Sequence, residues 1–140
     1  GVILRKKEIT GLSSFDFTHC PDLAQTVAVT CALTGQTSDF TGLESLRIKE
    51  TDRIDALQKE LAKIGKGLGG TIGQGAYTYT FPSANVQIHT YEDHRMAMAF
   101  MPLITRTKLV IDDPEVVNKS YPSFWKHCSL LEIVPEYKNE

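Results

Sequence analysis

The apolar spacing over residues 50–64 is the feature that most restricts how this chain folds. Ile54, Leu57, Leu61 and Ile64 recur at intervals of three and four residues, so on a helix they form one stripe. Gly65 and the glycines that follow are typical of a helix end. Because a helix with one apolar stripe must bury it against another element, the pattern predicts a helix that forms one layer of a larger structure.

Similar signals along the chain predict an alternation of strands and helices. Pro21 and Gly35 bracket a predicted helix over 22–33, while Asp93 and Ser120 are predicted caps for helices over 94–103 and 121–131. Extended segments are predicted at 2–6, 15–18, 37–40, 77–81, 86–90 and 109–111, the fourth as part of a hairpin and the last as a buried strand. The alternation predicts an α/β (α+β) class with layered sheet and helices.

Composition excludes several classes of protein. The 140 residues suffice for one domain, and a formal net charge of -2 argues against a general nucleic-acid binder. No apolar run reaches the roughly 20 residues that a membrane span needs. Three cysteines without a Cys-x-x-Cys spacing predict free thiols in a reducing cytoplasm and neither a disulfide framework nor a metal site. The start at Gly1, followed directly by apolar residues, suggests a piece of a longer protein.

Charged residues at the start of the 50–64 segment suggest an anion site. Lys49 and Arg53 are four residues apart, so they share a helix face near the end that already carries partial positive charge. An anion would stabilise both cations there. Glu50 continues the apolar stripe, so its carboxyl is expected to be partly desolvated and able to exchange a proton with a substrate. A solvated helix start with charges of both signs is the alternative.

Further charged residues lie at other predicted helix starts. Arg95 falls in the first turn of one helix and Lys119 just before the last. A bound anion explains both, although a salt bridge from Arg95 to a neighbouring acid and a solvated Lys119 explain them too. Asp22 in a first turn would stabilise its helix by roughly 0.3–1 kcal/mol without any catalytic role. His94 is either a general acid or a histidine that supports the helix cap.

Four blocks of sequence together resemble the 5-enolpyruvylshikimate-3-phosphate synthase family. They are Cys20-Pro21-Asp22, Arg47-Ile48-Lys49-Glu50-Thr51-Asp52-Arg53-Ile54, Asp93-His94-Arg95-Met96-Ala97-Met98, and Asp113-Pro114 with Lys119-Ser120-Tyr121-Pro122. The blocks occur in the family's order and cover most of the chain.

The resemblance implies a fold and a reaction. The fold would be the enolpyruvyl transferase fold of repeated β-α-β-α-β-β units in two domains, with residues 1–140 as the C-terminal portion of the second domain. The reaction would move the enolpyruvyl group of phosphoenolpyruvate to the 5-hydroxyl of shikimate 3-phosphate and release phosphate. This step belongs to the shikimate pathway toward chorismate and aromatic amino acids. No metal or organic cofactor is implied.

The resemblance also assigns roles to individual residues. Three cations would bind phosphoenolpyruvate, namely Arg53, Arg95 and Lys119. Asp22 would contact the acceptor hydroxyl as the candidate base, and Glu50 would handle the proton at the methylene carbon of the donor. Lys49 would contact shikimate 3-phosphate. Ser45 stands where the family often has an asparagine, so its hydroxyl would replace an amide contact to the same substrate.

The resemblance covers part of an enzyme, and two other functions compete with it. Further contacts belong to a first domain that is absent from this chain, so the isolated chain is expected to be inactive and to bind phosphoenolpyruvate weakly. The related transferase acting on UDP-N-acetylglucosamine shares the fold and the donor, but its motifs fit less well. A non-catalytic anion-binding module would use the same cations without turnover.

Overall fold

The computed structural model describes residues 3, 5, 14–36, 38–48, 52–67, 77–79 and 85–133. The strands are β1 (Ser14–Asp16), β2 (Asp39–Thr41), β3 (Gly65–Gly67), β4 (Tyr77–Tyr79), β5 (Val86–Ile88) and β6 (Leu109–Ile111). The α-helices are α1 (Ala24–Thr34), α2 (Arg53–Ala62), α3 (His94–Phe100) and α4 (Phe124–Cys128). The 3-10 helices are η1 (Pro21–Leu23), η2 (Glu44–Ile48), η3 (Met101–Thr105), η4 (Pro114–Lys119) and η5 (Ser129–Leu131).

The order of strands and α-helices confirms the predicted α/β class. β1 pairs in parallel with β2 across α1, β5 pairs in parallel with β6 across α3, and β3 pairs antiparallel with β4. Without the 3-10 helices, the chain reads β-α-β-α-β-β and then β-α-β-α. Within the described residues, the first six elements therefore follow the order of one predicted unit, and the next four follow the order of the start of a second.

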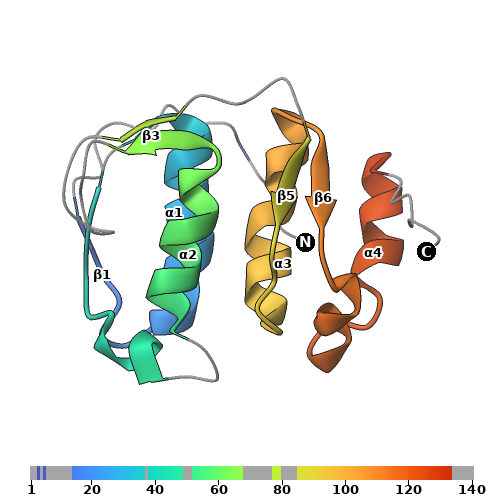
Figure 1. The fold of residues 1–140 in the computed structure, drawn as a ribbon. Coiled ribbons are helices and arrows are strands. Elements are labelled where there is room, and N and C mark those ends of the chain that lie inside the picture. Colours follow the sequence, from blue (N-terminus) through green and yellow to red (C-terminus); the bar gives the residue numbers. More distant parts are fainter. Residues whose placement is uncertain are drawn as a thin grey trace.

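The helices α1, α2 and α3 share one apolar core with β5. The predicted apolar stripe is buried, since Leu57 on α2 and Ile64 just after it are fully enclosed and Leu61 is 8% exposed. Figure 1 shows α1 and α2 side by side, with α3 and its strands next to them. A second cluster joins Ile54 at the start of α2 to Phe17 after β1. The start of α2 is thus packed against the segment that leads into η1.

The helix ends follow their capping residues. The side chain of Asp52 accepts hydrogen bonds from the backbone N–H groups of Ile54 at 3.0 Å and Asp55 at 3.1 Å, so α2 begins at Arg53. Asp93 caps α3 as predicted. Gly35 ends α1 in the left-handed conformation, at a φ of 69°.

Two expectations near the C-terminus are wrong. Ser120 does not begin a helix over 121–131, because the backbone turns from Tyr121 to Phe124 and α4 starts only at Phe124. Ser120 instead follows η4, whose last residue is Lys119. The strand at 109–111 is half-buried throughout, where full burial was predicted, because one short parallel partner covers it within the described residues.

Some expectations fall outside the described residues. They are Lys49, Glu50, most of the strand predicted at 2–6, and the connection between β3 and β4. Among the helices of the described ranges, none combines the length and the apolar character needed to cross a membrane.

Gly42 is expected to be essential where β2 leaves the sheet. Its φ is 70°, and an added Cβ would lie 2.6 Å from Thr18 Oγ1, 2.8 Å from Asp16 Oδ1 and closer still to Thr18 N. Gly35 has a similar φ of 69° but open space around it. We therefore expect Gly42→Ala to lower the free energy of unfolding by about 2–4 kcal/mol and Gly35→Ala by about 1 kcal/mol, measured by urea unfolding. Equal losses would show that the contact with the Asp16–Thr18 turn is unimportant.

Candidate functional site

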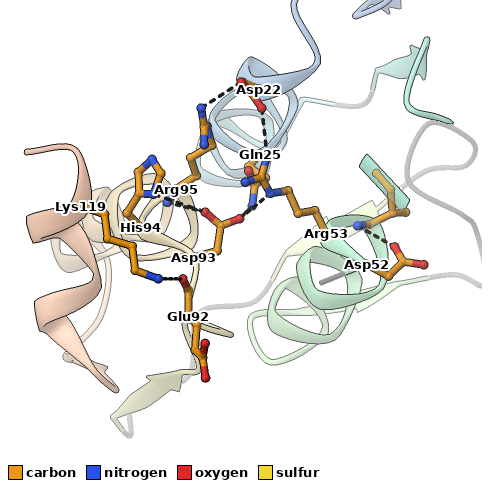
Figure 2. Close-up of polar contacts among 10 residues, drawn as sticks. Asp22, Gln25, Asp52, Arg53, Glu92, Asp93, His94, Arg95 and Lys119 are labelled. Carbon is orange, nitrogen blue, oxygen red and sulfur yellow. Dashed lines mark hydrogen bonds and ion pairs between the residues drawn. The ribbon is translucent and has the colours of Figure 1, made fainter. Parts of the chain in front are cut away.

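The carboxylate of Asp22 joins two arginines that are distant in the sequence. Oδ1 accepts from Arg53 Nη1 at 2.9 Å, and Oδ2 accepts from Arg95 Nη2 at 2.9 Å (Figure 2). Asp22 comes from η1, Arg53 is the first residue of α2, and Arg95 is the second residue of α3. A single side chain therefore links the starts of three helical segments.

A second carboxylate holds Arg53 from the other side. Asp93 Oδ2 lies 2.7 Å from Arg53 Nε, and both side chains are 5% exposed. Gln25 Nε2 donates to the same oxygen at 3.3 Å, and Asp93 Oδ1 accepts from the backbone N–H of Arg95 at 2.9 Å. Because a buried guanidinium is costly unless it is paired, the two carboxylates compensate the buried charge of Arg53 and fix its side chain inside the protein.

Lys119 is linked to the site by a hydrogen bond from its side chain to a backbone carbonyl group. Its Nζ donates to the carbonyl oxygen of Glu92 at 3.2 Å, while η4 packs against α3. Lys119 was expected to precede the last helix, but it ends η4, where a cation interacts favourably with the carbonyl end. At this end of a helix a lysine needs no bound anion to explain it, so the alternative of a solvated Lys119 gains support. Its ammonium group still lies beside the residues that precede α3 (Figure 2).

The site carries a positive excess that acts on His94. Among the charges that act on the pKa of His94, the three cations Arg95, Arg53 and Lys119 oppose the single carboxylate of Asp93. Partial burial lowers the pKa of His94 below its usual 6.5, and the charges of Arg95, Arg53 and Lys119 lower it further against the opposing effect of Asp93. The imidazole is therefore neutral at pH 7.

The structure brings together several of the predicted residues. Asp22 contacts both Arg53 and Arg95. The Arg95 guanidinium pairs with Asp22, while the backbone N–H of Arg95 bonds to Asp93. Ser45 is half-buried in η2, which contacts the η1 segment of Asp22. Lys49 and Glu50 lie outside the described residues, so their roles stay predictions.

Two contacts of the site were not predicted from the sequence. Asp93 was expected as a helix cap but also holds Arg53, and Gln25 was not singled out at all. Gln25 is fully buried on α1, between the buried Ala24 and Ala28. The one available signal was a polar side chain within an apolar helix. Across the described ranges, no group of three or more potential ligand side chains could hold a metal ion.

Comparison with known proteins gives matches that all carry the same family description. A family model described as EPSP synthase (3-phosphoshikimate 1-carboxyvinyltransferase) matches residues 2–128. Proteins named 3-phosphoshikimate 1-carboxyvinyltransferase from two strains of Bacteroides fragilis are 49% identical over 118 residues and 51% identical over 114 residues, in each case 79% of this chain and 28% of the relative. The protein of that name from Aliivibrio salmonicida is 34% identical over 135 residues, which is 94% of this chain and 31% of the relative.

His94 is expected to report anion binding. A bound anion offsets the cations that lower its pKa, so the NMR titration midpoint of His94 should lie below 6.5 and rise when sulfate is added. Sulfate keeps its charge over the titrated range, which isolates the histidine. By linkage, sulfate should bind more tightly as the pH falls through this midpoint. A midpoint that stays constant under saturating sulfate would place the anion away from the cluster.

His94 should also make folding pH-dependent. Its folded pKa lies below the unfolded value, so protonation favours the unfolded chain. The corresponding stability is present above pH 6.5 and decreases as the pH falls toward the folded pKa.

Asp22 is expected to compete with added anions for the two arginines. Asp22→Asn removes the negative charge between the guanidinium groups, so the affinity of the 140-residue chain for sulfate should rise about threefold to tenfold in isothermal titration calorimetry. Asp39→Asn, on the exposed edge of β2, is the control with the same charge change and should leave the affinity unaltered. Weaker binding in Asp22→Asn would mean that Asp22 organises the arginines more than it competes for them.

Proposed function

The chain belongs to the EPSP synthase family, and we propose that it forms part of an enzyme that transfers the enolpyruvyl group of phosphoenolpyruvate to the 5-hydroxyl of shikimate 3-phosphate. The observation that supports this proposal most directly is the convergence of Asp22, Arg53 and Arg95 from three separate segments. Two anionic substrates need cations beside a carboxylate that can move a proton, and this cluster contains both.

The donor is assigned to the cations of the cluster. Arg53 and Arg95 both bond to Asp22, so their guanidinium groups lie in one region, and a guanidinium matches the paired oxygens of a phosphate or carboxylate. Lys119 adds a third cation beside Glu92. We assign the phosphate and carboxylate of phosphoenolpyruvate to these three residues, which then hold the donor while negative charge moves to the departing phosphate.

The acceptor is assigned to the Asp22 side of the cluster. The Asp22 side chain is 46% exposed, so an incoming hydroxyl can reach it even though the carboxylate bridges two arginines. The hydroxyl would replace one of these bonds, give its proton to Asp22 and add to the carbon that bears the phosphate. Ser45, half-buried in the adjoining η2, and Lys49 would hold the rest of shikimate 3-phosphate.

Proton transfer at the methylene carbon is assigned to Glu50. During addition this carbon gains a proton and becomes a methyl group, which produces a tetrahedral intermediate. During elimination the methyl group loses a proton while the bond to phosphate breaks, which restores the carbon–carbon double bond of the enolpyruvyl group. Glu50 precedes Arg53 by three residues in the sequence, which supports a place near the donor.

The rest of the enzyme would complete the site. The chain spans about a third or less of the curated relatives that it matches. We propose that residues 1–140 are the C-terminal portion of the second domain and that the other domain supplies the opposite wall of the cleft. Cys20, Cys31 and Cys128 are all free thiols, which supports an enzyme that works in the reducing cytoplasm.

The proposal is tested by phosphate release from the full-length enzyme. We expect turnover with shikimate 3-phosphate, and Glu50→Gln should lower kcat by about 10²–10⁴-fold with little change in the KM for phosphoenolpyruvate. Unchanged turnover in Glu50→Gln would remove the carboxyl from the mechanism and favour an anion-binding module. Turnover with UDP-N-acetylglucosamine in place of shikimate 3-phosphate would indicate the related transferase.

The isolated chain provides the matched control in the same assay. Lacking the other wall of the cleft, it should release no phosphate above background while still binding sulfate weakly. Turnover close to that of the full-length enzyme would contradict the division of the site between two domains.

A further inference from the structure

The segment that leads into α3 has an unusual backbone. Tyr91 and Glu92 both have positive φ values, 53° and 57°, although neither is glycine. Side chains in this left-handed region are strained, and two in succession persist only where surrounding contacts hold them. Asp93 follows directly and returns the chain to an extended conformation before the helix. The turn therefore needs a restraint outside its own residues.

That restraint comes from Glu60, a fully buried carboxylate on α2. Its Oε1 accepts from the hydroxyl of Tyr91 at 2.9 Å, and its Oε2 accepts from the backbone N–H of His89 at 3.0 Å. Lys63 pairs with the same carboxylate and donates to the carbonyl oxygen of Gln87 at 2.8 Å. Burial and the bond to Glu60 raise the pKa of Tyr91 to about 12. Glu60 and Lys63 thus hold the backbone from β5 into the turn.

Helix α2 holds the Tyr91–Glu92 turn through a second contact as well. Glu60 lies seven residues after Arg53, which is about two helical turns, so both side chains leave α2 on one face. Arg53 pairs with Asp93 after the turn, and Glu60 bonds to Tyr91 within it. The turn is therefore fixed against α2 from both ends.

Two cations of the site depend on where this turn lies. The carbonyl oxygen of Glu92 accepts from Lys119, and the carboxylate of Asp93 holds Arg53. We infer that Glu60 is a positioning residue of the anion site: by fixing the Tyr91–Glu92 turn, it sets the places of Lys119 and Arg53 without itself meeting the substrate. This inference rests on the proposed function only in taking these cations as the ligands of an anion.

A role in packing alone does not explain a carboxylate at this position. Leu57 and Leu61 are among the buried neighbours of Glu60 along α2. Apolar residues often replace buried ion pairs without loss of stability, so an apolar side chain would serve a purely structural purpose. What such a side chain cannot do is accept from both the Tyr91 hydroxyl and the His89 N–H.

The inference is tested with Glu60→Gln and Tyr91→Phe in the 140-residue chain. Each change loosens the turn, so the sulfate dissociation constant should rise about tenfold in calorimetry. The NMR titration midpoint of His94, which is surrounded by Asp93, Arg95, Arg53 and Lys119, should rise by about half a pH unit as the cations leave their places. If Glu60→Gln does not fold, Tyr91→Phe decides, because it leaves the buried charge pair intact.

Leu103→Ala is the matched control for lost stability. Leu103 is buried in η3, beyond the far end of α3, so this variant should unfold at a lower temperature and keep both the sulfate affinity and the His94 midpoint. The inference would be overturned if folded Glu60→Gln and Tyr91→Phe kept the wild-type sulfate affinity and His94 midpoint. It would also be overturned if Leu103→Ala changed both quantities by the same amounts.

The two readouts separate this inference from the proposed function. Failure of the wild-type chain to bind sulfate would count against the anion site. The His94 midpoint would still show whether Glu60 sets the positions of the cations.

Discussion

The buried guanidinium of Arg53 is the group on which the site depends. The Arg53 side chain is 5% exposed, and its charge is acceptable there because Asp22 and Asp93 approach it from two other segments. The same pairing brings η1, α2 and the start of α3 together at one point, where Arg95 also reaches Asp22. Stability and chemistry are thereby coupled: the contacts that make a buried arginine tolerable also gather the residues that we assign to substrate binding.

Helix caps and tight turns surround this cluster and determine where the backbone places each side chain. Asp52 and Asp93 cap the two helices that carry the arginines, so each arginine lies in a first helical turn. Gly42 lets β2 pass close to the Asp16–Thr18 turn, which precedes η1 and Asp22. The left-handed turn at Tyr91 and Glu92, held by Glu60, aims a carbonyl oxygen at Lys119. Each device is short, and together they place groups that are up to 97 residues apart in the sequence.

Much of the fold was predictable because periodicity and capping are local. The stripe of α2, the cap at Asp93 and the helix end at Gly35 follow from residues within a few positions of each other. Predictions failed where a local signal competes with a tertiary one. Ser120 and Pro122 resemble a helix start, yet the backbone first turns through Tyr121 to Phe124. The segment 109–111 is as apolar as a central strand but is only half-buried in its two-strand sheet.

The sequence by itself determined the class of fold, the family resemblance and the identity of the charged candidates, because motif and periodicity are written in the order of residues. It left open whether Arg95 and Lys119 pair with neighbouring residues or bind an anion, since both explanations are compatible with the same sequence. Tertiary structure decided that Arg95 pairs with Asp22, 73 residues away, and that Asp93 and Gln25 support Arg53. These partners depend on which helix starts meet in space, and that is set by the packing of α1, α2 and α3 around a common core.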